Sequence, residues 1–271
     1  MGGTNTAYAL ISRDGTVVER GSLPTTGHIS AQVWAEKLWE SLREMIERNG
    51  VGEEIEGIGI GAPCANTITG CIEAATDLPW PSPIPLKERM ERLSGIKVSV
   101  ANDANAAALG EYVCGAGKKY NSMVMLTLGT GVGGGVVADG KLFEGNKGAG
   151  AELGHEVICY GGEKCTCGRR GCLEAYASAT ALVRQARRAM DKAPGSLLWK
   201  LTDGNKDNVN GKIVFDALRR GDKTAKAVVK KYVGYLATGI ANAINVFRPE
   251  AIVLGGGICN AGDVFLKPLA K

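Results

Sequence analysis

The sequence lacks several features that would assign it to a specialised class of protein. It has no run of about 18 apolar residues and no secretory signal pattern, so nothing in it predicts a membrane span or export. A strong charge of one sign is also absent, because the net charge is only +4, which does not predict a nucleic acid partner. Histidine is scarce. One of the two histidines, His28, lies in a polar loop and is expected at the surface.

The cysteines do not fit the pattern of a disulfide framework. Eight are present, and three of them fall close together near residue 170. The other five are isolated along the chain, which leaves an odd number without an obvious pairing and favours a reducing, cytoplasmic compartment. These isolated cysteines are Cys64, Cys71, Cys114, Cys159 and Cys259.

The three clustered cysteines and the second histidine form a metal-ligand pattern. His155 is followed by Cys165-Thr-Cys167 and then by Cys172. One imidazole and three thiolates complete the tetrahedral set that Zn²⁺ prefers and leave no open position for water, so we expect a structural zinc that fixes a loop. The alternative is a cluster of buried free thiols. Two glutamates, Glu152 and Glu174, bracket the loop and are not needed as ligands, so they must serve another purpose.

The order of the expected elements predicts an α/β protein. Hydrophobic residues make up 45% of the chain, and its length allows two lobes. Apolar residues alternate or run together in some segments and recur at helical spacing in others. The expected strands are 4–12, 16–23, 55–60, 97–101, 122–128, 133–138 and 251–254; the expected helices are 30–48, one that ends near 93, 102–113, 177–190 and 224–247.

Three glycine-rich segments follow or join the expected strands, at 2–6, 129–135 and 255–257. Backbone N–H groups in such segments can approach a phosphate closely, and Thr4 and Thr130 add hydroxyl groups. None of the segments has the Gly-Lys-Ser/Thr ending of a P-loop. Each one alone is weak evidence, since many such segments are ordinary hairpin turns. The three together make phosphate binding as plausible as that alternative.

Asn102 and Asp103 stand where an expected strand meets an alanine-rich helix. Ligands of open α/β sheets bind at the carboxyl ends of strands, so Asp103 is a candidate general base for phosphoryl transfer. An unperturbed Asp has a pKa of about 3.9 and is ionised at neutral pH. The simpler alternative is that the pair caps the helix.

Taken in order, these segments resemble one family. Gly-Gly-Thr-Asn, Asn-Asp at a helix start, Leu-Gly-Thr-Gly-x-Gly-Gly-Gly, Glu-Leu-Gly-His, Cys-x-Cys-Gly-x-x-Gly-Cys-Leu-Glu and Gly-Gly-Gly are similar to the ROK family of bacterial sugar kinases, repressors and open reading frames. The resemblance covers essentially the whole chain. It implies the actin-like ATPase (ribonuclease H-like) fold, with a smaller α/β lobe at 1–101, a larger one at 102–271 and a cleft for sugar and ATP.

The resemblance also implies roles for individual residues. Asp103 would be the catalytic base that activates a sugar hydroxyl, the 6-hydroxyl of a hexose, and it would also contact the substrate. The other hydroxyls would bind Asn102, Glu152, His155 and Glu174. The zinc ligands would be His155, Cys165, Cys167 and Cys172. The binding site for ATP with Mg²⁺ would be lined by Gly3, Thr4, Thr130, Gly131 and Gly256.

The chain departs from the family pattern at three places. Met1 stands directly before Gly2-Gly3, where the family carries a strand with an Asp, and the chain stops soon after Gly257, so both ends are shortened relative to the family. The segment Pro63-Cys64 replaces the commoner Pro-Gly. Glucose is the expected substrate. The alternatives are an N-acetyl-hexosamine kinase and a catalytically impaired sugar-binding regulator. By analogy with the family, the chain could form a homo-oligomer. Neither a nucleic acid nor a membrane is an expected partner.

Overall fold

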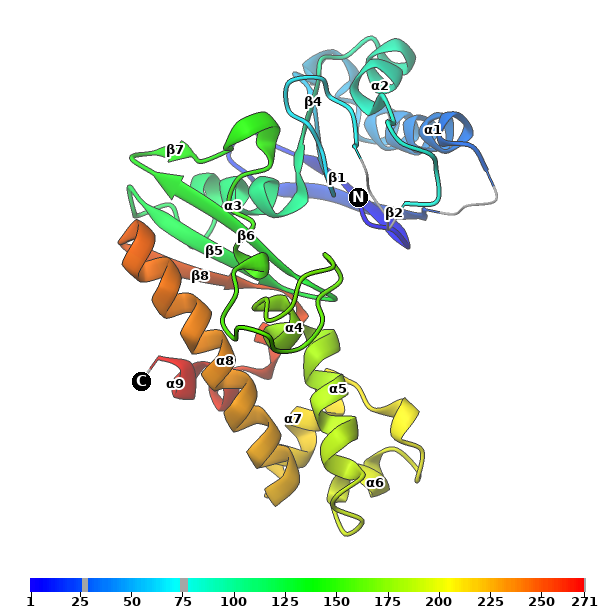
Figure 1. Ribbon diagram of the computed structural model, residues 1–271. Coiled ribbons are helices and arrows are strands. Elements are labelled where there is room, and N and C mark those ends of the chain that lie inside the picture. Colours follow the sequence, from blue (N-terminus) through cyan, green and yellow to red (C-terminus); the bar gives the residue numbers. More distant parts are fainter. Residues whose placement is uncertain (26–28, 74–77, 271) are drawn as a thin grey trace. The chain divides into compact units, whose positions relative to one another are not determined.

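The computed structural model of the chain describes residues 1–25, 29–73 and 78–270 and divides into two compact units (Figure 1). Unit 1 comprises Met1–Lys119 and Lys141–Ala151, and unit 2 comprises Tyr120–Gly140 and Glu152–Lys271. The expectation that His28 lies at the surface concerns a residue outside the described ranges.

The bounds of the two units differ from those of the lobes expected at 1–101 and 102–271. Helix α3 (Asp103–Cys114) belongs to unit 1, because it begins where β4 (Val98–Asn102) ends and packs on β3 (Ile58–Ala62) and β4. A strand and the helix that directly follows it share one hydrophobic contact surface, so they stay in the same compact unit.

Among the residues described in unit 1, four strands form two pairs. β1 (Asn5–Ile11) pairs with β2 (Val17–Pro24) in an antiparallel hairpin, and β3 pairs with β4 in parallel. The other elements of unit 1 are α1 (Ala31–Asn49), η1 (Gly52–Glu54), α2 (Leu86–Ser94), β7 (Lys141–Leu142) and η2 (Asn146–Gly148).

Helix α1 follows the sequence prediction closely. The side chain of Ser30 accepts a hydrogen bond from the backbone N–H of Val33 at 3.2 Å, which makes Ser30 the N-cap. The helix ends at Gly50, whose φ of 67° is left-handed. Its apolar stripe buries Trp34 and Leu38 in the core of unit 1, which fixes the orientation of the helix.

The sheet of unit 2 is built on a buried central strand. β5 (Met123–Leu128) pairs antiparallel with β6 (Val132–Ala138) on one side and parallel with β8 (Ala251–Gly255) on the other. Strand β5 is buried at five of its six positions, so side chains on both of its faces are covered. The remaining elements of unit 2 are η3 (Leu153–His155), α4 (Glu174–Ala177), α5 (Ala179–Met190), α6 (Leu197–Leu201), η4 (Lys206–Asn208), α7 (Gly211–Arg219), α8 (Lys223–Phe247), η5 (Gly257–Ala261) and α9 (Asp263–Leu269).

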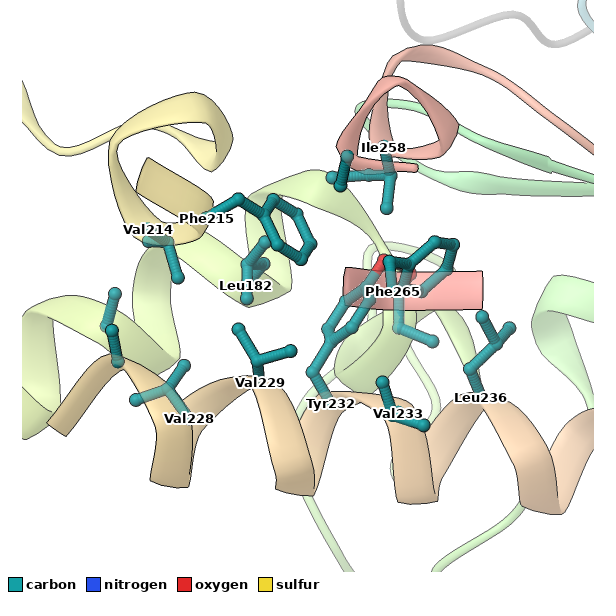
Figure 2. Close-up of a cluster of buried hydrophobic side chains, with 14 of the residues drawn as sticks. Leu182, Val214, Phe215, Val228, Val229, Tyr232, Val233, Leu236, Ile258 and Phe265 are labelled. Carbon is teal, nitrogen blue, oxygen red and sulfur yellow. Dashed lines mark hydrogen bonds between the residues drawn. The ribbon is translucent and has the colours of Figure 1, made fainter. Parts of the chain in front are cut away.

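The long helix α8 carries the core of unit 2. Figure 2 shows its apolar face, which includes Tyr232 and Leu236, directed at side chains from α5, α7, η5 and α9. Tyr232 is fully buried, and its hydroxyl donates a hydrogen bond to the carbonyl of Ala177 at 2.6 Å. A buried hydroxyl without a partner is costly, so this bond also fixes the end of α4 against α8.

The helix expected at 177–190 is interrupted, and this prediction needs correction. Ser178 has an extended backbone, and its side chain accepts from the N–H of Ala181 at 3.0 Å. It therefore ends α4 and caps α5. Helices α6, α7 and α9 were not expected from the sequence, because they are too short to show a clear helical period of apolar residues. No helix among the described residues has the length and the apolar character needed to cross a membrane.

Candidate functional site

The predicted zinc ligands lie together in unit 2. His155, Cys165, Cys167 and Cys172 each offer one ligand atom, and these four atoms lie within 4.8 Å of one another. The Sγ atom of Cys165 is 3.6 Å from Nδ1 of His155, and the Sγ atoms of Cys167 and Cys172 are 3.7 Å apart. The last distance excludes a disulfide, whose sulfur atoms are about 2.05 Å apart.

These separations fit a tetrahedral metal ion. With a Zn–S bond of about 2.3 Å, the sulfur atoms of a tetrahedral site are about 3.8 Å apart. Both measured contacts agree with that edge length, and the four donors are of the types that zinc prefers. His155 approaches the sulfur through Nδ1, so Nε2 is left to bind another group.

Two of the thiols are unsuited to lose their protons without a cation. Burial raises the pKa of Cys165, and burial raises the pKa of Cys172 to about 12. In contrast, a hydrogen bond from the backbone N–H of Arg169 lowers the pKa of Cys167 to about 7. A divalent ion would displace the remaining protons, because thiolates are the form that binds metals. When bound, the ion supplies positive charge and fixes the loop.

The cysteine loop is also anchored by side chains outside the ligand set. The hydroxyl of Tyr176 accepts a hydrogen bond from the N–H of Glu163 at 2.7 Å, and Arg169 donates to the carbonyl of His155 at 2.5 Å. The carboxylate of Glu163 pairs with Arg188 at 2.5 Å, which holds the pKa of Glu163 below its ordinary value. These contacts connect the loop to α4 and α5.

Glu152 and His155 occupy one turn of the short helix η3. The N–H of His155 donates to the carbonyl of Glu152 at 3.0 Å, and in a 3₁₀ turn residues i and i+3 lie on the same side. Gly154 allows this turn to lie against β6, since a Cβ there would be 1.9 Å from the carbonyl oxygen of Val132. Glu152 and His155 therefore lie on the same side of this 3₁₀ turn.

The carboxylate of Glu174 lies between the cysteine loop and the glycine turn that joins β5 to β6. Its Oε1 accepts from the hydroxyl of Thr166 at 2.7 Å, and its Oε2 accepts from the N–H of Val132 at 3.1 Å. A Cβ on Gly131 would be 2.4 Å from Oε2, so glycine leaves room for the carboxylate. Oε1 also accepts from the thiol of Cys165 at 3.5 Å, whereas Oε2 keeps a second lone pair for another donor.

Asn102 and Asp103 lie in unit 1 at the junction of β4 and α3. Oδ1 of Asn102 accepts from the N–H groups of Ala104 at 2.9 Å and Asn105 at 3.2 Å, so the helix-cap interpretation is confirmed for this residue. Oδ1 of Asp103 accepts from the N–H of Ala104 at 2.9 Å, and the side chain is exposed. The residues predicted to bind the nucleotide belong to both units. Gly3 and Thr4 precede β1 in unit 1, whereas Thr130, Gly131 and Gly256 follow β5 and β8 in unit 2.

Sequence reasoning missed three participants in this region. Thr166 donates a hydrogen bond to Glu174. Its position between two of the cysteines was the only feature of the sequence that could have pointed to this role. Tyr176 and Thr180 were also missed. The hydroxyl of Thr180 donates to the carbonyl of Thr130 at 2.8 Å and so fixes the glycine turn from α5. Their roles depend on contacts between distant segments, which no local pattern predicts.

Comparison with known proteins supports the resemblance. The ROK family model matches residues 1–271. A glucokinase of Thermotoga maritima is 39% identical over 272 residues, which cover 100% of this chain and 84% of that protein. A glucokinase of Halalkalibacterium halodurans is 38% identical, with coverage of 100% and 82%. The crystal structure of a ROK family glucokinase from Streptomyces griseus in complex with glucose and AMPPNP superposes with a TM-score of 0.85, is 33% identical and covers 100% of this chain and 85% of that one. The expected α/β fold of the actin-like ATPase type is thereby confirmed.

Relatives with another substrate match this chain as well. An N-acetylmannosamine kinase of Vibrio cholerae is 30% identical over 273 residues, with coverage of 100% of this chain and 86% of that protein. The family comparison therefore does not distinguish between a hexose and its 2-acetamido derivative.

Proposed function

Because the chain belongs to the ROK family, we propose that it transfers the γ-phosphoryl group of ATP to the 6-hydroxyl of a hexose, glucose, with Asp103 as the general base. The observation that supports this most directly is the position of Asp103. It is the first residue of α3, immediately beyond the carboxyl end of β4, and its carboxylate is exposed. Ligands of α/β proteins bind at this end of the strands.

In the proposed reaction, Asp103 accepts the proton of the sugar hydroxyl while the hydroxyl oxygen attacks the γ-phosphorus. The bond between that phosphorus and the bridging oxygen breaks, and ADP leaves. One oxygen of Asp103 already accepts from the N–H of Ala104, which orients the carboxylate. Mg²⁺ bound with ATP would neutralise charge on the phosphates.

The sugar hydroxyls would bind to Asn102, Glu152, His155 and Glu174. The cap bonds occupy Oδ1 of Asn102, so its amide NH₂ is the group offered to the sugar. Since Nδ1 of His155 faces the cysteine sulfur, Nε2–H is the donor that it presents. Glu174 offers the second lone pair of Oε2. Zinc would position His155 without contacting the reacting atoms.

The nucleotide would be bound by backbone N–H groups and hydroxyls at Gly3, Thr4, Thr130, Gly131 and Gly256. The turn that contains Thr130 is held from two directions, by the Thr180 hydroxyl and by the Glu174 carboxylate. A fixed turn keeps its N–H donors directed at the phosphate charge, so the backbone does not have to rearrange during the reaction. Phosphoryl transfer depends on such positioning.

The test is a panel of sugars with ATP and Mg²⁺ in a coupled assay for ADP. We expect the highest kcat/KM for glucose. A higher value for N-acetylmannosamine or N-acetylglucosamine would favour the N-acetyl-hexosamine kinase. Saturable sugar binding without ADP release from any sugar would favour the regulator and contradict the proposal.

A further inference from the structure

The segment between β7 and Glu152 folds into a closed loop that belongs to unit 1, and we call its residues 144–151 the return loop. The N–H of Gly150 donates to the carbonyl of Glu144 at 2.8 Å. A Cβ on Gly145 would be 2.7 Å from Cα of Gly150, so the two ends of the loop are in direct contact. The return loop is therefore compact, and its last residue is joined directly to Glu152.

Two residues of the return loop have a left-handed backbone although they carry a Cβ. The φ angle is 60° at Lys147 and 61° at Ala151. This conformation costs free energy for residues other than glycine, and it persists where surrounding contacts fix it. Because Ala151 directly precedes Glu152, its backbone angles set the direction in which the chain reaches that glutamate. The contacts that fix the return loop therefore bear on a residue assigned to the sugar.

The tip of the return loop is attached to two other segments of unit 1. The N–H of Thr67, in the segment that follows β3, donates to the carbonyl of Lys147 at 3.1 Å. The side-chain Nδ2 of Asn105 donates to the carbonyl of Gly148 at 3.3 Å. Asn105 and Gly148 are both buried, so bulk water does not compete for this second bond.

Asn105 links the tip of the return loop to the helix that carries Asp103. It follows Asp103 by two residues on the first turn of α3, and its backbone N–H donates to Oδ1 of the cap residue Asn102 at 3.2 Å. The cap fixes the backbone of Asn105, and Gly148 fixes its side chain. The return loop is thus attached to the same helical turn as the proposed general base.

Stability alone does not account for the amide of Asn105. The carbonyl of Gly148 can only accept, so the NH₂ group faces it and Oδ1 points elsewhere. Among the residues that the structure describes, this Oδ1 is buried and receives no hydrogen bond. A buried acceptor without a donor lowers the free energy of unfolding, and an apolar side chain would avoid that cost. What an apolar side chain could not supply is the donor for Gly148.

We propose that Asn105 is a positioning residue for the sugar: by holding the tip of the return loop, it fixes the backbone that leads into Glu152 and so orients that carboxylate. The proposal rests on the proposed function, in which Glu152 binds a sugar hydroxyl that does not react. Such a contact stabilises the bound substrate and the transition state equally, so its loss raises KM and leaves kcat unchanged. A loss of folded protein would instead lower the apparent kcat and leave KM unchanged.

Two variants of opposite size test the role of the Asn105 amide. Asn105→Leu has a larger side chain and Asn105→Ser a smaller one, and neither can donate to Gly148. In both, we expect amide hydrogen exchange by NMR at Thr67 and Gly150 to be at least about tenfold faster than in the wild type. We also expect the KM for glucose to rise at least about fivefold, with kcat within about twofold.

Three results would overturn the proposal. Unchanged exchange at Thr67 and Gly150 in both variants would show that Asn105 does not hold the return loop. Faster exchange with an unchanged KM for glucose would show that the loop does not position Glu152. An effect on KM in only one of the two variants would assign it to side-chain volume and not to the lost donor.

Ser94→Ala is the matched control in unit 1. The hydroxyl of Ser94 donates to the carbonyl of Met90 at 2.7 Å on α2, so this variant loses a hydrogen bond from a side chain to the backbone away from the return loop. Its KM for glucose and its exchange rate at Thr67 should equal those of the wild type. A rise in KM as large as in Asn105→Leu would show that any destabilisation of unit 1 weakens sugar binding, which would contradict the proposal.

Failure of the proposed function has a different signature. If the wild-type protein releases no ADP with any sugar, the kinase proposal fails, but the exchange comparison needs no activity. Sugar affinity then replaces KM: the Kd for glucose by calorimetry should still rise at least about fivefold in both Asn105 variants. An unchanged Kd would refute the positioning role of Asn105.

Discussion

The carboxylate of Glu174 accepts a hydrogen bond from the backbone N–H of Val132 at 3.1 Å. This bond joins the helix that follows the cysteine loop to the start of β6, next to the glycine turn. The other carboxylate oxygen accepts from Thr166, which lies between two zinc ligands. One side chain therefore connects the proposed metal site with the proposed nucleotide turn, and loss of either contact should affect both.

A methyl group on Gly131 should displace this carboxylate. In Gly131→Ala the Cβ would be 2.4 Å from Oε2 of Glu174, so the bond to Val132 must lengthen or break. We expect a loss of about 1–3 kcal/mol in unfolding free energy and a lower kcat/KM with ATP. Gly129→Ala is the control in the same turn, because its Cβ would meet nothing within 4 Å. Equal unfolding midpoints in urea for the two variants would contradict this role of Glu174.

The metal site predicts a stoichiometry. Elemental analysis of the purified protein should find about one zinc per chain, and Cys167→Ser should lower this to near zero. Cys71→Ser is the matched control, because Cys71 lies outside the cluster and its thiol bonds to the carbonyl of Thr69, which a serine hydroxyl can also do. Wild-type protein that is fully folded without zinc, and whose thermal midpoint does not respond to a chelator, would refute the ligand assignment.

Glu19 predicts a pH dependence in unit 1. The side chain of Arg48 donates a hydrogen bond to Glu19 at 2.7 Å and is the main cause of a pKa below the ordinary 4.5. A depressed carboxyl pKa contributes stability above the unfolded-state value, and this contribution is lost as the pH falls through the folded-state value.

The wild-type protein should therefore be more stable than Glu19→Gln at pH 7, and the difference should shrink below about pH 4.5. Urea unfolding of both proteins at a series of pH values measures this difference in unfolding free energy. Glu40→Gln changes an exposed carboxylate on α1 and serves as the control. A difference between wild type and Glu19→Gln that stays constant down to pH 3 would contradict the assigned cause.

Much of the fold could be predicted from local patterns. Ser30 as a cap and Asp14-Gly15 as a hairpin turn are short-range signals, and both correspond to the structure. Ser178 shows the limit of such patterns: the apolar spacing continues across it, but its side chain caps a new helix. Helix α9 was missed because it is seven residues long with Pro268 inside it, and Phe265 is buried only through contacts with distant segments.

The candidate site could be predicted in part. Along the chain, each of the four metal ligands lies within ten residues of another one. Their types and spacing specify zinc. The role of Glu174 in holding the glycine turn could not be predicted, because Val132 is 42 positions away.

The most direct test of the central claim is single-turnover phosphoryl transfer to glucose by Asp103→Asn. The amide keeps an oxygen that can accept from the N–H of Ala104 and removes only the ability to take a proton. We predict a fall in kcat of about 10²–10⁴-fold, with the Kd for glucose by calorimetry within about threefold of wild type. ADP release at the wild-type rate would show that Asp103 is not the general base.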